Sequence, residues 1–314
     1  MERGEYLPLG CYGKLPFWPE YLKENVSYPS SRALVSWIHE GRGEASLGAE
    51  GGQAASPPEE TARLRFLHGE VGSPEIVAGV IRPSADQGGL RKFPFLVLTH
   101  LPRRLYGGKS YSLLPLALAP VWEALDHAWD TLASVASRDA FREVQSSLRI
   151  PSPAPPRETE GIYRSHQKEK AGGFMGRADG ASAERLAANM PELVAQIRRG
   201  AGALRVVLPV SSDPEAACLD TSFWADLINR QFMLRRVELS VFLDESPRQA
   251  ERKVLLAHPP LTPPDYAVIM GGADSAAGIL RPAHPAVGQA DPSGAPGPEV
   301  TYAELLARRF PATR

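Results

Sequence analysis

Apolar residues along the first half of the chain follow the pattern of β-strands. Residues 6–15 are apolar and aromatic with glycine breaks, and three further apolar runs occupy 63–69, 76–83 and 93–101. Runs that are apolar at nearly every position are typical of strands covered on both faces. The sequence therefore predicts a sheet with helices packed against it.

Helical periodicity accompanies these strands. Ser30 or Ser31 is suited to cap a helix that Gly41 ends. Farther along, one helix face is expected from apolar residues that recur at intervals of three and four: Leu118, Trp122, Leu125, Trp129, Leu132 and Ala136. A second, shorter helix is expected around residues 141–148.

The second half repeats the alternation of strand and helix. Apolar runs at 203–210 and 237–243 predict strands, and a helix with an apolar face lies between them. A short helix is expected to begin at Thr262 and to end at Gly271. The predicted fold is α/β, or α+β, with a mixed β-sheet flanked by helices and a second, smaller α/β subdomain at the C-terminal end.

Composition along the chain divides it into segments. An N-terminal domain is expected over 1–150, with a mobile loop at 41–60, where large apolar side chains are almost absent. Proline, glycine and charge at 151–181 indicate a linker. The C-terminal subdomain is then 182–282, and 283–314 is a proline- and glycine-rich tail with a short terminal helix.

Charge and cysteine content restrict the function. The 314 residues carry 35 Lys and Arg against 36 Asp and Glu, a net charge of -1, which argues against nucleic-acid binding through a basic surface. Two cysteines fit a reducing cytosol. No apolar run approaches the ~20 residues of a membrane helix. We therefore expect a cytoplasmic protein with no membrane insertion.

Motifs that carry chemistry are missing from the sequence. The seven histidines form no HExxH pair, and no GxSxG motif occurs. Cys11, on an apolar strand, is expected to be a small buried hydrophobe and not a nucleophile. We predict no catalytic residues, no metal and no cofactor.

Several separated motifs resemble one family. They are the segment Gly10–Pro16 (GCYGKLP), a helix with Trp37, RLRFLHG at 63–69, AGVIRPSAD at 78–86 followed by Gly88, and FPF at 93–95. In this order and spacing the chain resembles the TagF (ImpM) family of bacterial type VI secretion, over roughly residues 9–130. Phe17-Trp18-Pro19-Glu20 replaces the family's usual continuation of the first motif, and four residues instead of three separate Gly88 from Phe93. The resemblance therefore indicates a divergent member.

The resemblance implies a non-enzymatic cytosolic accessory protein. It would repress type VI secretion after translation by binding an FHA-domain scaffold or other secretion components, in parallel with a Ser/Thr kinase and phosphatase pathway. The family-matching residues in turns are the candidate partner-binding residues: Lys14, Pro16, Pro83, Ser84, Asp86 and Gly88. Strand ends and tight turns also need such residues, so a structural role for each stays open.

Two other functions remain open. An enzyme with an unrecognised active site would bring Asp86, His100 and His127 together in one pocket. A structural adaptor that docks another protein complex would instead expose an apolar patch away from the turns named above.

Overall fold

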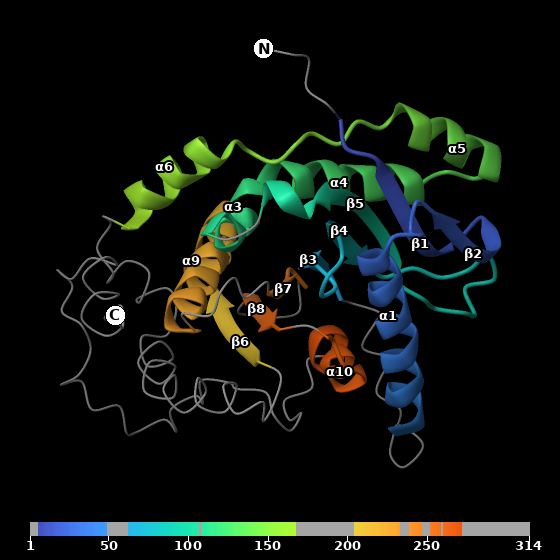
Figure 1. The fold of residues 1–314 in the computed structure, drawn as a ribbon. Coiled ribbons are helices and arrows are strands. Elements are labelled where there is room, and N and C mark those ends of the chain that lie inside the picture. The colour runs from blue at the N-terminus through green and yellow to red at the C-terminus, as the bar shows by residue number, and fades with distance from the viewer. Residues whose placement is uncertain are drawn as a thin grey trace.

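A computed structural model gives the fold. It describes residues 6–48, 62–106, 109–167, 204–232, 239–246, 252–258 and 260–271. The strands are β1 (Leu9–Leu15), β2 (Trp18–Glu24), β3 (Leu64–His68), β4 (Glu75–Arg82), β5 (Phe95–Pro102), β6 (Arg205–Val210), β7 (Ser240–Asp244) and β8 (Arg252–Ala257). They form one eight-stranded sheet in the order β2-β1-β5-β4-β3-β7-β8-β6 (Figure 1).

Helices connect these strands. They are α1 (Pro29–Gly48), the 3-10 turn η3 (Arg103–Leu105), α2 (Lys109–Ser112), α3 (Leu114–Ala117), α4 (Ala119–Ala133), α5 (Arg138–Ser147), α6 (Pro156–Gln167), α9 (Pro214–Phe232) and α10 (Pro263–Gly271). The predicted helices at 118–136, 141–148 and 262–271 are confirmed as α4, α5 and α10. The α/β class is confirmed as well.

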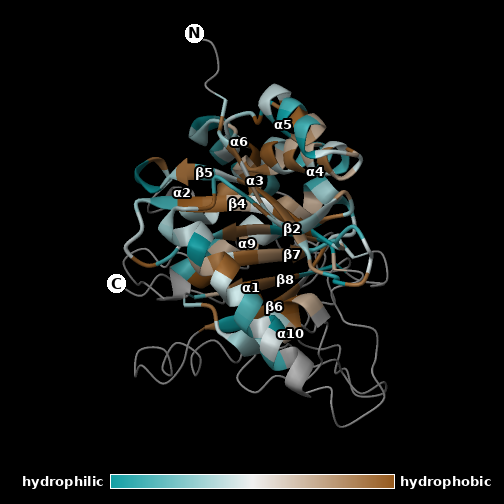
Figure 2. Cartoon of the chain, turned by 90° about the vertical axis from the view of Figure 1, so that its right-hand side faces the viewer, coloured by the Kyte–Doolittle hydropathy of each residue, from teal (hydrophilic) through white to brown (hydrophobic). Residues whose placement is uncertain are grey.

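The central strands are covered on both faces, as their apolar runs predicted. Leu67 and Val80 belong to a core that also includes residues of α3, α4 and α9. Phe66 and Val77, whose side chains point to the other face of the sheet, belong to a second core with residues of α1 and α10. Figure 2 shows the strands as a largely hydrophobic layer among helices that carry hydrophilic residues.

The C-terminal strands extend this same sheet. Strand β7 pairs with β3, with Leu64 opposite Asp244, and β8 lies between β7 and β6. All described strand pairs are antiparallel, so the expected mixed pairing is corrected. Strands β6 and β7 do run parallel on either side of α9, but β8 separates them. The described C-terminal elements therefore share the N-terminal sheet and form no sheet of their own.

Two strands were absent from the sequence prediction. Strand β2 contains Pro19 and mostly exposed residues, so its pattern does not resemble that of a buried strand. Proline is accepted there because β2 is an edge strand, where one side of the backbone needs no ladder partner. Strand β8 has a short apolar run, Val254–Ala257, behind the charged Arg252 and Lys253, and the prediction did not include it.

Helix α1 continues beyond its predicted end. Gly41 was expected to end it and to open a loop at 41–60, yet residues 41–48 are helical. A Cβ atom at Gly41 would lie 2.2 Å from Cβ of Tyr266, so glycine is required there because α1 crosses α10 closely. Trp37 reinforces the crossing by donating from Nε1 to the carbonyl of Thr262 at 2.8 Å. Residues 49–60 lie outside the described part.

The start of α1 is stabilised from β4. Instead of a serine side chain, the Glu75 carboxylate accepts a hydrogen bond from the Ser30 backbone N–H at 2.9 Å. Burial opposes the charge of Glu75, but hydrogen bonds from Ser73 and Ser30 hold its pKa below the usual value. A buried carboxylate at a helix N-terminus also complements the helix dipole.

The predicted linker is partly helical. Within 151–181, residues 156–167 form α6, and the Tyr163 hydroxyl donates to Asp226 of α9 at 2.9 Å. This contact fixes α6 on the helical layer. A free linker would have no such contact. Residues 168–181 and the tail at 283–314 with its expected helix lie outside the described residues.

Buried charges connect the two halves of the chain. Arg65 of β3 and Arg82 of β4 share two carboxylates, Asp126 of α4 and Glu245 at the end of β7. Arg65 Nε lies 3.2 Å from Glu245 Oε1, and Arg82 Nη2 lies 3.0 Å from Glu245 Oε2. The side chains of Arg65, Arg82 and Glu245 are 9–10% exposed. Removing one partner would leave like charges close together in a poorly solvated place.

We expect Glu245→Gln to lower the free energy of unfolding by about 3 kcal/mol, because it leaves two buried guanidinium groups with one carboxylate. Urea unfolding of the full chain measures this. The matched control is Glu160→Gln, which breaks the exposed pair with Arg164 and should cost no more than about 0.5 kcal/mol. Equal stability losses in the two variants would contradict the prediction.

His68 is a second buried ionisable group in the sheet. Its Nδ1 lies 2.8 Å from Ser240 Oγ, and its Nε2 lies 4.0 Å from Glu70 Oε2. Burial, together with the nearby Arg103 guanidinium, lowers the pKa of His68 from 6.5 to about 4. The folded protein therefore holds this imidazole neutral at pH values where the unfolded chain protonates it.

Stability should fall as pH drops from 6.5 to about 4. In this window the unfolded state binds the proton of His68 and the folded state does not, so the loss from this residue amounts to about 3 kcal/mol at pH 4. Urea unfolding of wild type and His68→Gln at several pH values checks it, since the variant should lose this part of the slope. Identical slopes would assign the acid sensitivity to other groups.

Candidate functional site

Strand pairing gathers all six predicted partner-binding residues at one end of the sheet. Strands β1 and β4 both pair with β5, with Tyr12 opposite Leu96 and Arg82 opposite Phe95. The β1–β2 turn (16–17) and the β4–β5 loop (83–94) therefore lie at the same end. We call these two segments, with Lys14 beside them, the loop end.

The β4–β5 loop is internally hydrogen-bonded. The Asp86 backbone N–H donates to the carbonyl of Arg91 at 3.1 Å, and that of Gly89 donates to the carbonyl of Asp86 at 2.9 Å. The Asp86 carboxylate also accepts from Nε of Arg91 at 2.6 Å. The hydrogen bond from the Arg91 side chain is the main reason that the pKa of Asp86 lies below its usual value. Asp86 thus holds the loop in one shape.

A backbone carbonyl connects this loop to the first motif. The carbonyl oxygen of Pro19 accepts from Lys14 Nζ at 2.6 Å and from Arg91 Nη2 at 3.0 Å. Lys14 is buried, and its ammonium lies 4.4 Å from the ring centroid of Tyr21. Lys14 and Asp86 are consequently positioning residues, whose polar atoms are used within the chain.

Aromatic rings form the base of the loop end. Phe93 is buried against Tyr21 and His39, with ring centroids 4.9 and 5.0 Å away, and Tyr12 stacks on Tyr21. Nε2 of His39 lies 2.6 Å from the Tyr12 hydroxyl. Burial, followed by the charge of Arg42, lowers the pKa of His39. The rings support the last residues of the loop from below.

The remaining predicted residues differ in exposure. Pro16 and Gly88 are exposed, whereas Pro83 and Ser84 are half-buried. A Cβ at Gly88 would sit 3.8 Å from its nearest neighbours, an ordinary contact. The positive φ of the loop, +67°, belongs to Gly89, so Gly89 is the glycine that the turn requires.

Sequence reasoning missed the most exposed feature of the loop. Leu90 is 90% exposed at the tip, beside Arg91 and Lys92, which are also exposed. A single leucine between a glycine pair and two basic residues was the available signal. It was overlooked because isolated exposed apolar residues are common on protein surfaces.

The three residues that the enzyme alternative required lie apart. Asp86 is tied to Arg91 at the loop end, while His100 Nε2 lies 2.7 Å from the carbonyl of Asn25 near the opposite end. His127 is exposed on α4. These three side chains therefore form no common pocket.

The two cysteines are free and buried. Burial raises the pKa of the Cys11 thiol well above its usual range and that of Cys218 to about 11. A protonated buried thiol is a poor nucleophile.

Within the described part of the chain, no three His, Cys, Asp or Glu side chains are placed to hold a metal ion. No described helix is both long and apolar enough to cross a membrane.

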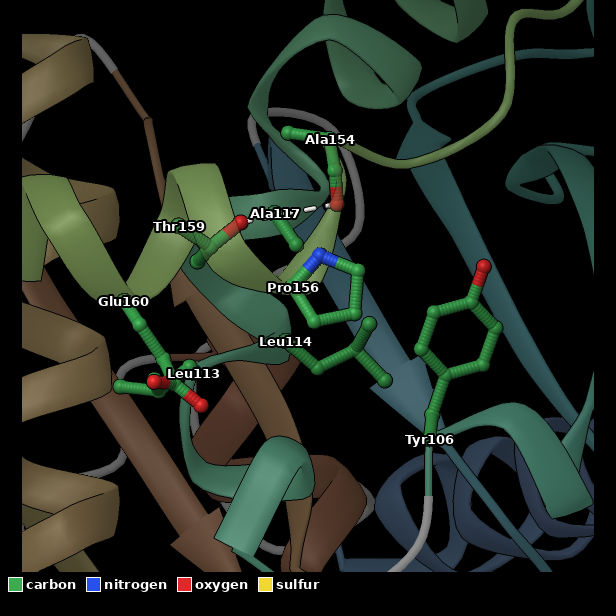
Figure 3. A pocket seen from close by; sticks show the side chains of 8 residues that line it. All are labelled: Tyr106, Leu113, Leu114, Ala117, Ala154, Pro156, Thr159 and Glu160. Atoms are coloured by element: carbon green, nitrogen blue, oxygen red, sulfur yellow. Dashed lines mark hydrogen bonds between the residues drawn. The ribbon is translucent and has the colours of Figure 1, made fainter.

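A small apolar pocket lies between α3, the start of α6 and Tyr106 (Figure 3). Its lining residues are Tyr106, Leu113, Leu114, Ala117, Ala154, Pro156, Thr159 and Glu160. The Thr159 hydroxyl donates to the carbonyl of Pro155 at 3.1 Å, and Glu160 pairs with Arg164. These polar groups are used within the chain, so the pocket offers little for chemistry.

Comparison with known proteins gives the class of the chain. Residues 10–148 match the family model for the TagF N-terminal domain, type VI secretion system-associated. This part of the chain belongs to that family, and the protein is type VI secretion-associated. The match confirms the family that the motifs resembled.

Structural comparison finds PA0076 from Pseudomonas aeruginosa PAO1, whose crystal structure is known. The similarity has 24% sequence identity and a TM-score of 0.33. It covers 47% of this chain and 64% of that chain, which is less than two thirds of its length. No curated protein matches the chain.

We expect Lys14→Ala and Asp86→Ala to act differently. Lys14→Ala removes a buried stem and a hydrogen bond, and should lower the free energy of unfolding by about 2 kcal/mol. Asp86→Ala should leave the thermal midpoint almost unchanged but speed amide exchange at Arg91, because the backbone N–H of Arg91 loses the carboxylate that accepts from it at 3.3 Å. Gln87→Ala, exposed in the same loop, is the control. If Lys14→Ala leaves the thermal midpoint unaltered, Lys14 does not stabilise the fold, and a direct contact with a partner is favoured for it instead.

Proposed function

We propose that the chain is a cytoplasmic, non-enzymatic repressor of type VI secretion. It acts after translation by binding an FHA-domain scaffold or another secretion component through the loop end. The observation that carries this proposal is the TagF N-terminal domain match over residues 10–148, whose shared motifs meet at the loop end. Pro16 and Gly88 are far apart in sequence, exposed and at the same end of the sheet, and the buried Lys14 and Asp86 hold their segments in place.

The use of the polar groups supports binding over catalysis. At the loop end Lys14, Asp86 and Arg91 are engaged with one another or with the carbonyl of Pro19. A reacting group must instead be free to meet a substrate. Repression by sequestration needs only a surface that competes with assembly of the secretion apparatus.

The order within the loop supports its use as a contact. A preformed loop loses little conformational entropy on binding, so more of the interaction energy remains as affinity. Buried Phe93 and the bonds of Asp86 hold both ends of the loop in place. The adaptor alternative would use the opposite end of the sheet, where Val71 and Leu105 are 67% and 58% exposed.

The test is co-purification of the full-length tagged chain from its own host, followed by mass spectrometry and measurement of affinity for the recovered component. We expect stoichiometric recovery of an FHA-domain scaffold. Gly88→Gln adds bulk at an unstrained exposed position and should weaken binding about tenfold with an unchanged thermal midpoint.

The matched control is Gly161→Gln on α6, where a side chain would enter open space. This variant should bind like wild type. Failure to recover any type VI component, when the scaffold is demonstrably present in the cells, would refute the proposed function. If both glycine variants bind equally well, the proposed function stands, but the contact does not lie at the loop end.

A further inference from the structure

We propose that Leu90 is the anchor of this contact, and that it inserts into an apolar pocket with an acidic rim on a protein partner. This inference rests on the proposed function, because it names the chemistry of the partner surface that meets the loop end. Three features of the loop carry it: the exposure of Leu90, the rigidity of its support and the charge around it.

Exposure sets Leu90 apart from the other apolar residues. At 90% it is the most exposed large apolar side chain in the described part of the chain, and Val71 follows at 67%. When a partner covers an exposed leucine, the free energy of the complex falls in proportion to the apolar area that is buried. In the isolated chain Leu90 buries little of its surface, so this stabilisation is available only in a complex.

Rigidity keeps Leu90 from folding back onto the protein. Arg91, the next residue, is held on both sides, by the Asp86 carboxylate and by the carbonyl of Pro19. The preceding residue, Gly89, is fixed at φ +67°. Close to Leu90 Cγ lies Gly88, which has no side chain to cover it. Leu90 is therefore presented at a fixed position, as a binding anchor requires.

Charge near the anchor indicates the rim of the partner pocket. Lys14 is buried and bonded to the carbonyl of Pro19, so the basic groups that the tip presents are Arg91, which pairs with Asp86, and Lys92. Glu20 of β2 is an exposed acid at the same end, and Arg42 lies over the ring of Phe93. Arg91 and Lys92 are the charged residues that directly follow Leu90 and face outward. A pocket with carboxylates at its rim would complement this pattern, and its binding should weaken with salt.

The first experiment measures the affinity of full-length variants for the component that co-purifies with wild type. Leu90→Asp should bind about thirtyfold more weakly, whereas Leu90→Met should bind within about threefold of wild type. Val71→Asp, an equally drastic change at the opposite end of β4, should leave the affinity unchanged. Because both side chains are exposed, all thermal midpoints should stay the same.

The outcomes separate this inference from the proposed function. If Leu90→Asp binds as well as wild type, the anchor is refuted while the function stands. If Val71→Asp alone loses binding, the anchor is again refuted and the adaptor alternative is favoured. If wild type recovers no type VI component, the function is refuted, and the anchor is judged by cross-linking.

The second experiment places a photo-cross-linking residue at position 90, and at position 71 as comparison, in the full chain in its host. We expect a protein adduct from position 90 whose cross-linked peptide contains apolar residues flanked by Asp or Glu, and neutralising those acids should weaken binding. No adduct from position 90 would refute the anchor. Flotation with phosphatidylglycerol vesicles that depends on Leu90 would also refute it, and would assign the tip to a membrane surface.

Discussion

One backbone carbonyl joins the two segments on which the loop end depends. The oxygen of Pro19 accepts from Lys14 of the first motif and from Arg91, which lies in the β4–β5 loop between the later motifs. Pro19 sits on the edge strand β2, where backbone groups on the outer side have no neighbouring strand and bond to side chains or water. Two charged donors satisfy it, and in doing so they fix the β4–β5 loop against β2. The shape of the loop end is thus determined by two hydrogen bonds to one carbonyl, one from the buried Lys14 and one from the largely exposed Arg91.

A similar dependence couples the two halves of the chain. The TagF N-terminal domain ends at residue 148, yet its strand β3 pairs with β7 from the C-terminal half. Glu245, at the end of β7, supplies one of the two carboxylates that neutralise Arg65 and Arg82. Arg82 directly precedes the β4–β5 loop. The C-terminal strands therefore help to hold the strand from which the loop emerges.

The sequence predicted the strands and helices that show apolar periodicity. It missed features that depend on contacts between residues far apart in the chain. Strands β3, β4 and β5 and helix α4 were foreseen because burial on two faces, or on one helix face, leaves a direct pattern. Gly41 was misread because its partner, Tyr266, is 225 residues away in the chain. Lys14 and Asp86 were named together as candidate partner-binding residues, but their burial and their place at one end of the sheet follow only from the pairing of β1 and β4 with β5.

The same division explains how a loop can keep its shape while its recognition changes. Asp86, Gly89 and Arg91 determine the conformation of the loop through backbone geometry and internal hydrogen bonds. Leu90 at the tip has 90% of its surface in solvent, so its identity affects the fold very little. A replacement of Leu90 therefore changes the surface that the loop presents and leaves the conformation of the loop unchanged. Under the proposed function, specificity for the partner would therefore reside in a residue that the shared motifs do not include.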